Sequence, residues 1–528
     1  MSGLIIEGGI YLLILLTPFA FGGIEAWAQG IIQILAGIVV AVWAWRALDR
    51  GRAEKRMGAS AGAPGGFAVW IPMILFVLMV CFQLVPIPAG WIQRLSPGVD
   101  ALYRRTLPGY AGGAGSDSVS LPSWLVATQS DKLPASSAGS AIDAGLLNPP
   151  GGSAGFAARS RSWRTLSIYT FETRQRLSML LCYVGLFAVA GSHFNSKDRL
   201  ARLLGAAVLS GFAVSLFGII QKLNWNGKLY WVREGTYINI FGPFVNRNNY
   251  AAFAGTVLPV AVCMGLLSLK RVEEGRRDAV PRLVLWGFAA ATMSVGVFYS
   301  LSRGGILSTA LSFVVVAVLL LYYGARGRDL VVLVGVMAAS GALLLWIGPE
   351  KVVERVGTLS EGQNMQTMTL RFGAWKRCLG LIADHLAFGT GLGTFRYGFM
   401  RYAPPGETWW TFADNEYIEL ICDTGLIGGG LLLAGFVGYL LHVGRPGRIR
   451  GSSDRYAYTG LAAGLMALLI HSAVSANLQM PANALLLAVL GGALLGVTRR
   501  HEPRIARKVD VQPRLALPWA DDSTGRRS

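Results

Sequence analysis

The chain has 528 residues, of which 53% are apolar and 15% are charged, and its mean hydropathy is positive. It carries more apolar surface than one soluble core could bury, which excludes a soluble domain and favours a polytopic membrane protein. The net charge of +19 follows the predicted loops, so we interpret it as a topology signal and expect no nucleic-acid partner. Five cysteines without CxxC spacing predict neither a disulfide framework nor a metal site.

The predicted elements begin with an apolar run at the amino terminus, which has no preceding basic residue and no clear small-residue cleavage site. We therefore expect a retained first helix and not a removed signal peptide. About 20 apolar residues are needed to cross the hydrocarbon layer, and we count about twelve such runs. Their predicted starts are Leu4, Ala28, Phe67, Leu177, Leu200, Tyr250, Leu283, Ile306, Leu330, Tyr417, Ala457 and Asn483.

Basic residues fall in every second loop of this arrangement, for example in 50–56 and 270–277. The positive-inside rule therefore places these loops and both termini in the cytoplasm. Three longer segments then face the opposite, outer side: 86–174, 222–249 and 348–416. We call the last of these, 348–416, the polar segment. A long loop kept between two membrane spans is usually functional or disordered, and the polar segment is too aromatic to be disordered. We expect it to hold the chemistry.

The first outer loop has two distinct parts. Its middle, Tyr110 to Ala158, is rich in Gly, Ala, Ser and Pro and predicts a flexible insertion. Its end, residues 166–171, alternates as a short strand would before the fourth helix. At the other end of the chain, the tail after Arg499 is basic and has no periodic apolar face, so we expect it to be mobile.

Three outer arginines stand apart from the basic clusters: Arg247, Arg303 and Arg371. An arginine at the bilayer centre costs about 2.5 to 3.5 kcal/mol, so Arg303 predicts the outer boundary between the seventh and eighth helices. It either snorkels to anchor a helix end or binds a phosphate that the following Gly304 and Gly305 let approach the backbone. Three such cations brought together would bind a diphosphate. The alternative is that Arg247 and Arg371 form ion pairs with outer acidic residues, namely Glu234, Asp384 or Asp414.

Asparagines surround the start of the sixth helix, at Asn246, Asn248 and Asn249. One of them is expected to act as the N-cap. Their amides also suit sugar hydroxyls, as does the aromatic face of Trp409 in the polar segment. For Trp409 the alternative is a place in the aromatic belt at the membrane interface.

Within the polar segment, residues 369–383 place apolar side chains on one helical face and predict an amphipathic helix along the interface. The segment also contains the densest outer group of candidate bases, and abstraction of a proton needs one near the reacting hydroxyl. These are Asp384, His385, Asp414 and Glu416. A lone histidine in a loop is usually just exposed, so His385 is a minor candidate.

Four sequence segments, in their order and spacing, resemble the O-antigen ligase and polymerase family. They are FGPFVNRNNYAAFAGTVLPV, YSLSRGGILSTALSF, TLRFGAWKRCLGLIADHLAFGTGLGTF and ADNEYIELICDTGLIGG. With the closing HSAVSANLQMPANALLLAVLGG, the resemblance covers about Trp163 to Gly496. It does not separate ligases from polymerases.

The resemblance implies a GT-C-like membrane glycosyltransferase. Such an enzyme takes a glycan from an undecaprenyl diphosphate carrier at the periplasmic face of the bacterial inner membrane and joins it to an acceptor hydroxyl. The donor is already activated, so the resemblance implies no metal and no cofactor. In the family, periplasmic arginines are thought to hold the diphosphate, which maps here to Arg303 and Arg371.

This chain departs from the family pattern at two positions. Relatives commonly carry a histidine before the asparagine of the loop motif, and here Asp414 precedes Asn415. Either Asp414 is the general base, or catalysis depends on stabilising the leaving group and orienting the acceptor. A carboxylate common after the closing histidine motif of relatives is Ser475 here, which weakens any role for His471.

We therefore expect an all-α polytopic membrane protein with about twelve transmembrane helices and a large periplasmic loop between helices nine and ten. The expected divisions are 1–85 for helices one to three, 86–174 for a periplasmic loop with the flexible insertion, 175–347 for helices four to nine, 348–416 for the catalytic loop, 417–499 for helices ten to twelve and 500–528 for a basic cytoplasmic tail.

The predicted catalytic residues are Asp414, Arg303 and Arg371. The predicted substrate-binding residues are Arg247, Asn246, Asn248, Asn415, His385 and Trp409. The expected partners are an undecaprenyl-diphosphate-linked glycan donor, a glycan or lipid acceptor, membrane lipids and polysaccharide export machinery. Two other functions stay open: a transporter of lipid-linked glycans or small anions, and a non-catalytic glycan-binding component of an export complex.

Overall fold

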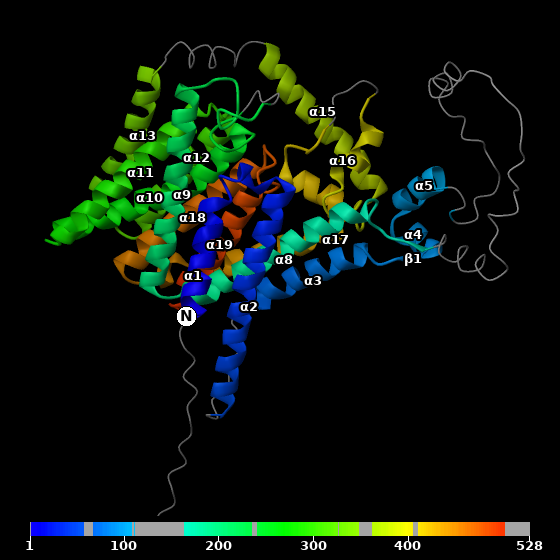
Figure 1. Cartoon of the computed structure of the whole chain (residues 1–528), viewed down its shortest axis with the longest axis horizontal. Coiled ribbons are helices and arrows are strands. Elements are labelled where there is room, and N and C mark those ends of the chain that lie inside the picture. Colours follow the sequence, from blue (N-terminus) through cyan, green and yellow to red (C-terminus); the bar gives the residue numbers. More distant parts are fainter. Residues whose placement is uncertain are drawn as a thin grey trace, which may run out of the picture.

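The computed structural model describes residues 2–56, 67–107, 110, 163–234, 240–325, 327–347, 362–404 and 410–501, and the structural statements below concern these residues. Long helices make up most of this part of the chain (Figure 1). Its amino-terminal half contains α1 (Ser2–Leu16), α2 (Ala26–Arg56), α3 (Phe67–Gln83), α4 (Ala89–Leu95), α5 (Pro97–Thr106), α8 (Thr170–His193) and α9 (Lys197–Leu223).

The carboxy-terminal half contains α10 (Arg247–Glu273), α11 (Val280–Tyr299), α12 (Arg303–Tyr322), α13 (Gly327–Ile347), α15 (Gly362–Asp384), α16 (Phe395–Gly398), α17 (Glu416–Val443), α18 (Ser452–Ser472) and α19 (Pro481–Arg499). Short 3₁₀ helices occur at η1 (Phe21–Gly23), η3 (Arg277–Ala279), η4 (Phe399–Tyr402) and η5 (Pro446–Arg448). One antiparallel pair of two-residue strands joins β1 (Ile87–Pro88) to β2 (Trp163–Arg164), with Ile87 opposite Arg164.

Each predicted start of an apolar run lies within a helix. Among the described residues, eight helical segments are long and apolar enough to cross a membrane: those containing α2, α8, α9, α10, α11, α12, α17 and α19. Two further apolar helices, α1 and α3, have only 15 and 17 residues. The chain is therefore an all-α membrane protein, while the count of twelve spans and the six divisions of the chain stay predictions.

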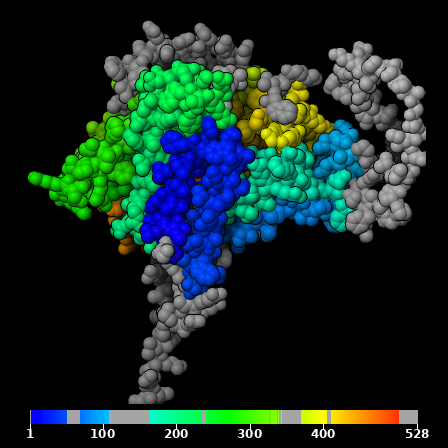
Figure 2. All heavy atoms as spheres, viewed as in Figure 1, coloured from blue at the N-terminus to red at the C-terminus, as the bar shows by residue number. Residues whose placement is uncertain are grey.

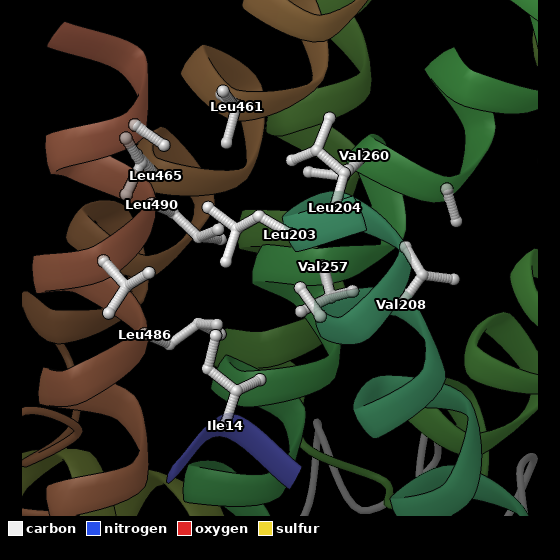
Figure 3. Packing of buried hydrophobic residues seen from close by; sticks show 14 of the residues in the cluster. Ile14, Leu203, Leu204, Val208, Val257, Val260, Leu461, Leu465, Leu486 and Leu490 are labelled. Carbon is white, nitrogen blue, oxygen red and sulfur yellow. The ribbon is translucent and has the colours of Figure 1, made fainter. Parts of the chain in front are cut away.

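The centre of the bundle is formed by α10 and α19, which are buried along nearly their whole length. Apolar side chains of α1, α9, α10, α18 and α19 meet there, including Ile14, Leu203, Val257, Leu461 and Leu486 (Figure 3). Figure 2 shows α1 and α2 on the outside of the bundle. Large apolar side chains such as Ile34 and Leu48 are exposed on α2, as expected for a helix that faces lipid.

The helix α17 is broken at Gly425, whose φ of 65° and ψ of −172° lie outside the helical region. The loop that follows α15 satisfies the backbone groups freed by the break. The amide of Thr390 donates to the carbonyl of Cys422 at 3.0 Å, and the amide of Leu426 donates to the carbonyl of Leu386 at 2.8 Å. Non-helical backbone in an apolar protein requires such partners, so the loop and the broken helix form one unit.

The strand predicted for residues 166–171 is wrong. The chain bends after β2, and α8 already begins at Thr170. The backbone amide of Ser167 donates to Gln83 of α3, and that of Ile168 donates to Thr390 in the loop after α15, at 3.0 and 2.9 Å. The backbone amides of this segment therefore bond to two different elements and not to a neighbouring strand.

The predicted insertion lies outside the described residues except for Tyr110, and the predicted mobile tail lies outside them except for Arg500 and His501. Those two residues pack onto Asp454, with N–O distances of 2.6 and 3.1 Å. The amphipathic helix predicted over 369–383 is part of α15, which buries Ala374, Cys378 and Leu381 against α16, η4 and α17.

The break in α17 predicts that replacing two glycines of the same helix by alanine has different effects on stability. Gly425→Ala places a Cβ at positive φ and against the carbonyl of Ala387, so we expect a loss of at least about 2 kcal/mol of stability. Gly430→Ala adds a Cβ where nothing lies within 4 Å, so we expect no loss. Thermal unfolding of the detergent-purified variants measures the difference, and equal melting temperatures would contradict the packing described above.

Candidate functional site

Two helix amino-termini lie side by side and carry two of the predicted arginines. Asn246 caps α10 and Ser302 caps α12, each by accepting a bond from a backbone amide of its own helix. The hydroxyl of Ser302 also donates to Oδ1 of Asn248 at 2.8 Å, which ties the two helix starts together. Arg247 and Arg303 are the first residues of these helices. The amino-terminal ends of two helices add partial positive charge to that of the arginines, which favours an anion.

The turn between α18 and α19, residues 473–480, packs against the start of α12. A Cβ at Gly304 would lie 2.9 Å from the ring of His471 and 3.1 Å from a methyl group of Val474. A glycine after Arg303 is thus what lets this turn approach the helix start. The neighbouring Leu301 has a positive φ of 56°, an uncommon conformation for a leucine, at the bend that leads into α12.

Arg371 of α15 reaches the same turn from the other side. Its guanidinium donates to the carbonyl of Val474 at 3.1 Å and pairs with the carboxylate of Asp414 at 3.0 Å. The side chains of Arg371 and Asp414 are 19% and 29% exposed, so a ligand can still reach both. Val474 therefore stands between Arg371 and the helix start that carries Arg303. The sequence offered an ion pair of Arg371 with an outer acidic residue as an alternative, and Arg371 makes such a pair with Asp414.

The backbone holds Asp414 in a strained conformation, with φ at 51°. Both backbone groups of the preceding Ala413 are bound: its amide donates to Glu419 of α17 at 2.8 Å, and its carbonyl accepts from the indole of Trp375 at 2.8 Å. The following Asn415 caps α17 by accepting from the amides of Tyr417 and Ile418. Asp414 is thus fixed between two anchored neighbours.

Burial raises the pKa of Asp414 above its ordinary value, and the nearby Arg371 guanidinium partly offsets this shift. A carboxylate with a raised pKa is a stronger base than an exposed aspartate. Its position beside an arginine and at a partly open surface suits proton abstraction from a hydroxyl group. An anion bound by the arginines would lie close to that carboxylate.

Three of the predicted binding residues make hydrogen bonds that cap or join helix ends. Asn246 and Asn415 use their amide oxygens as caps, and Asn248 uses its own to accept the bond from Ser302. A sugar would therefore meet the N–H groups of these amides. Trp409 lies outside the described residues.

His385 does not join this group. It follows the end of α15, about 20 Å along the helix from Arg371 by the usual rise per residue. Its ring is buried, with Nδ1 3.0 Å from the carbonyl of Leu381, and Gly98 of α5 packs against it. Burial lowers the pKa of His385. The expectation of an exposed loop histidine is therefore wrong, and the geometry indicates a packing role.

The sequence offered Glu416 only as a candidate base and missed Glu419, and both are buried carboxylates beside the site. Glu416 accepts from the amides of Leu478 and Gln479 in the 473–480 turn, at 2.6 and 3.2 Å. Glu419 accepts from Ala413 and from the side chain of Gln479, the latter at 3.0 Å. The available signal was their spacing: acidic residues three apart in an otherwise apolar helix mark a functional position. Within the described ranges, no group of three His, Cys, Asp or Glu side chains could hold a metal ion.

Comparison with known proteins found one family model that matches part of the chain. Residues 288–433 match the family model described as O-antigen ligase, and the matched range contains Arg303, Arg371 and Asp414. This match confirms, over residues 288–433, the resemblance to the O-antigen ligase family that the sequence segments indicated. No curated protein matches the chain.

The ion pair between Arg371 and Asp414 predicts a pH-dependent loss of stability in Arg371→Ala. The cost should lie between the roughly 0 to 1 kcal/mol of a surface pair and the roughly 3 to 5 kcal/mol of a fully buried one. Arg371 lowers the pKa of Asp414 by stabilising its charged form. The contribution of Arg371 to stability is therefore present above the pKa of Asp414 and disappears as the pH falls through that pKa. Melting temperatures of the variant and the unsubstituted protein should therefore converge toward acid pH.

Two further variants test this prediction. Arg371→Ala combined with Asp414→Ala should recover part of the lost stability, because no buried charge is then left without a partner. Arg448→Ala, at an exposed position of η5, should show the same stability difference at every pH. A constant difference for Arg371→Ala across the pH range would contradict the assigned pair.

Proposed function

We propose that the chain transfers or polymerises a glycan carried on undecaprenyl diphosphate, joining it to an acceptor hydroxyl at the periplasmic face of the inner membrane. One observation supports this most strongly: the convergence of the Arg303 helix start, the Arg371–Asp414 pair and the 473–480 turn. A bound diphosphate needs cations, and an attacking hydroxyl needs a carboxylate beside it. The 473–480 turn contacts both the start of α12 and Arg371, which supports a site that combines the two.

In the proposed reaction, the acceptor oxygen attacks the anomeric carbon of the donor sugar with inversion. A new C–O bond forms as the bond between the anomeric carbon and the diphosphate oxygen breaks, and the diphosphate leaves with the electron pair. Asp414 accepts the proton of the acceptor hydroxyl. Arg303 and Arg371 stabilise the developing negative charge, with Arg247 assisting from the neighbouring helix start.

Asn246, Asn248, Asn415 and Trp409 are the proposed sugar contacts. The proposed topology has about twelve membrane spans, cytoplasmic termini and the polar segment 348–416 as the periplasmic catalytic loop between the ninth and tenth spans. This arrangement puts the site on the side where the lipid-linked glycan is presented. The glycan or lipid acceptor would enter from the same side, and export machinery would take the product.

The arginines provide the direct test. Arg303→Ala and Arg371→Ala should each lower glycan transfer at least about 10-fold, because one charge-assisted hydrogen bond to phosphate contributes roughly 1.5 to 3 kcal/mol. Arg448→Ala should retain full transfer. The assay uses purified protein in liposomes with a lipid-diphosphate-linked glycan and measures the new glycosidic product per folded protein. If the three variants behave alike, the site assignment is wrong.

The same liposomes separate an enzyme from a transporter. Product formation without movement of the donor across the bilayer supports the proposal, and movement without product would reject it. Absence of both would favour a glycan-binding component of an export complex. In a deletion strain, accumulated single carrier-bound repeats indicate a lost polymerase, while long unattached chains indicate a lost ligase.

A further inference from the structure

Glu419 is a buried carboxylate whose two oxygens serve two different segments of the site. It is 3% exposed and lies one turn into α17. Oε2 accepts from the amide of Ala413, the residue before Asp414, and Oε1 accepts from the side-chain amide of Gln479 in the 473–480 turn. Glu419 therefore connects the segment that carries Asp414 to the turn that contacts Arg371.

The connection to Ala413 matters because of the conformation that follows it. A positive φ at a non-glycine residue costs about 1 to 3 kcal/mol and persists only when the surroundings impose it. Ala413 is fully buried and is bound through its amide by Glu419 and through its carbonyl by Trp375. These two bonds fix the two peptide units that flank the α-carbon of Ala413, the residue before Asp414. Asn415 fixes the next residue as the cap of α17.

The connection to Gln479 matters because that residue belongs to the turn on which Arg371 rests. The side-chain amide of Gln479 lies between Glu419 at 3.0 Å and Glu416 at 3.5 Å. Glu416 also holds the backbone amides of Leu478 and Gln479. The carbonyl of Val474, in the same turn, accepts from Arg371. One carboxylate network therefore supports both members of the Arg371–Asp414 pair.

We propose that Glu419 is a positioning residue for glycosyl transfer, which sets the geometry of Asp414 relative to Arg371 through Ala413 and Gln479. The inference rests on the function proposed above. Glu419 touches neither donor nor acceptor in this role. A carboxylate is required because two N–H donors converge on it, whereas a glutamine would present its own NH₂ group to one of them.

Hydrogen–deuterium exchange of the full-length protein in detergent tests the geometry without an activity assay. Glu419→Ala should speed exchange of the Ala413 amide, which loses its acceptor, and exchange should rise within 411–415. Asp423→Ala is the matched control: Asp423 is another buried carboxylate of α17, and its Oδ2 accepts from the amide of Gly393 at 2.6 Å. This control should raise exchange near residue 393 and leave 411–415 unchanged.

Kinetics test the consequence for catalysis. Glu419→Ala should lower kcat on the order of 10- to 100-fold, because small displacements of a catalytic group have effects of this size. KM for the lipid-linked donor should stay within about twofold, since the arginines that bind it are unchanged. Glu419→Gln, which keeps one acceptor oxygen, should recover part of kcat. Arg448→Ala, at an exposed position of η5, should behave as the unsubstituted protein.

The outcomes separate the two proposals. Unchanged exchange at 411–415 in Glu419→Ala overturns the positioning role, as does raised exchange with unchanged kcat. A rise in KM equal to the fall in kcat also counts against it. If the unsubstituted protein transfers no glycan, the proposed function fails, and the exchange data alone then decide whether Glu419 holds the amide of Ala413.

Discussion

Three buried carboxylates of α17 hold the three loops that build this end of the molecule. Glu416 binds the amides of the 473–480 turn, Glu419 binds the amide of Ala413, and Asp423 binds the amide of Gly393 in the loop after α15. Loops in an apolar protein have backbone N–H groups with no helical partner, and a buried N–H without an acceptor costs about 1 to 3 kcal/mol. The carboxylates supply those acceptors from one helix, so the mutual positions of the loops depend on α17.

The break at Gly425 follows from the same requirement. The loop after α15 runs so close to α17 that a Cβ at either Gly389 or Gly425 would overlap the facing backbone. Both glycines have positive φ, which other residues reach only with strain. The buried side chain of Gln83 on α3 binds the same unit by donating to Phe388 and Asp423 and accepting from Leu392. The candidate site therefore rests on a rigid support and not on a free loop.

The sequence was sufficient for the helices, because runs of apolar residues of the right length indicate them directly. It also predicted that one asparagine caps the sixth helix, a local interaction that Asn246 makes. Pairing of Arg371 with Asp414 was foreseen only as one of several options. Contacts between distant segments were not predictable: Val474 is 103 residues from Arg371, and nothing in either segment specifies the other.

The burial of His385 and the role of Glu419 could not be predicted from the sequence for the same reason. Each depends on which element packs against the residue: α5 for His385 and the 410–415 segment for Glu419. Residues 166–171 show the converse error, in which a local alternation suggested a strand. There the backbone amides of Ser167 and Ile168 bond to two distant elements and not to a strand. Local patterns thus revealed the helices and their caps, while the site arose from tertiary contacts.

The pairing of Arg371 with Asp414 also links the two halves of the proposed reaction. In the unliganded protein, Arg371 lowers the pKa of Asp414, while burial raises it. A diphosphate carries more charge than one carboxylate and offers several acceptor oxygens, so it competes for the guanidinium. If, in the proposed reaction, Arg371 turned to the diphosphate, Asp414 would lose the partner that stabilises its charged form, and burial would then make it a stronger base. Donor binding would in this way prepare the carboxylate for the acceptor, and the donor would be held before the hydroxyl is deprotonated.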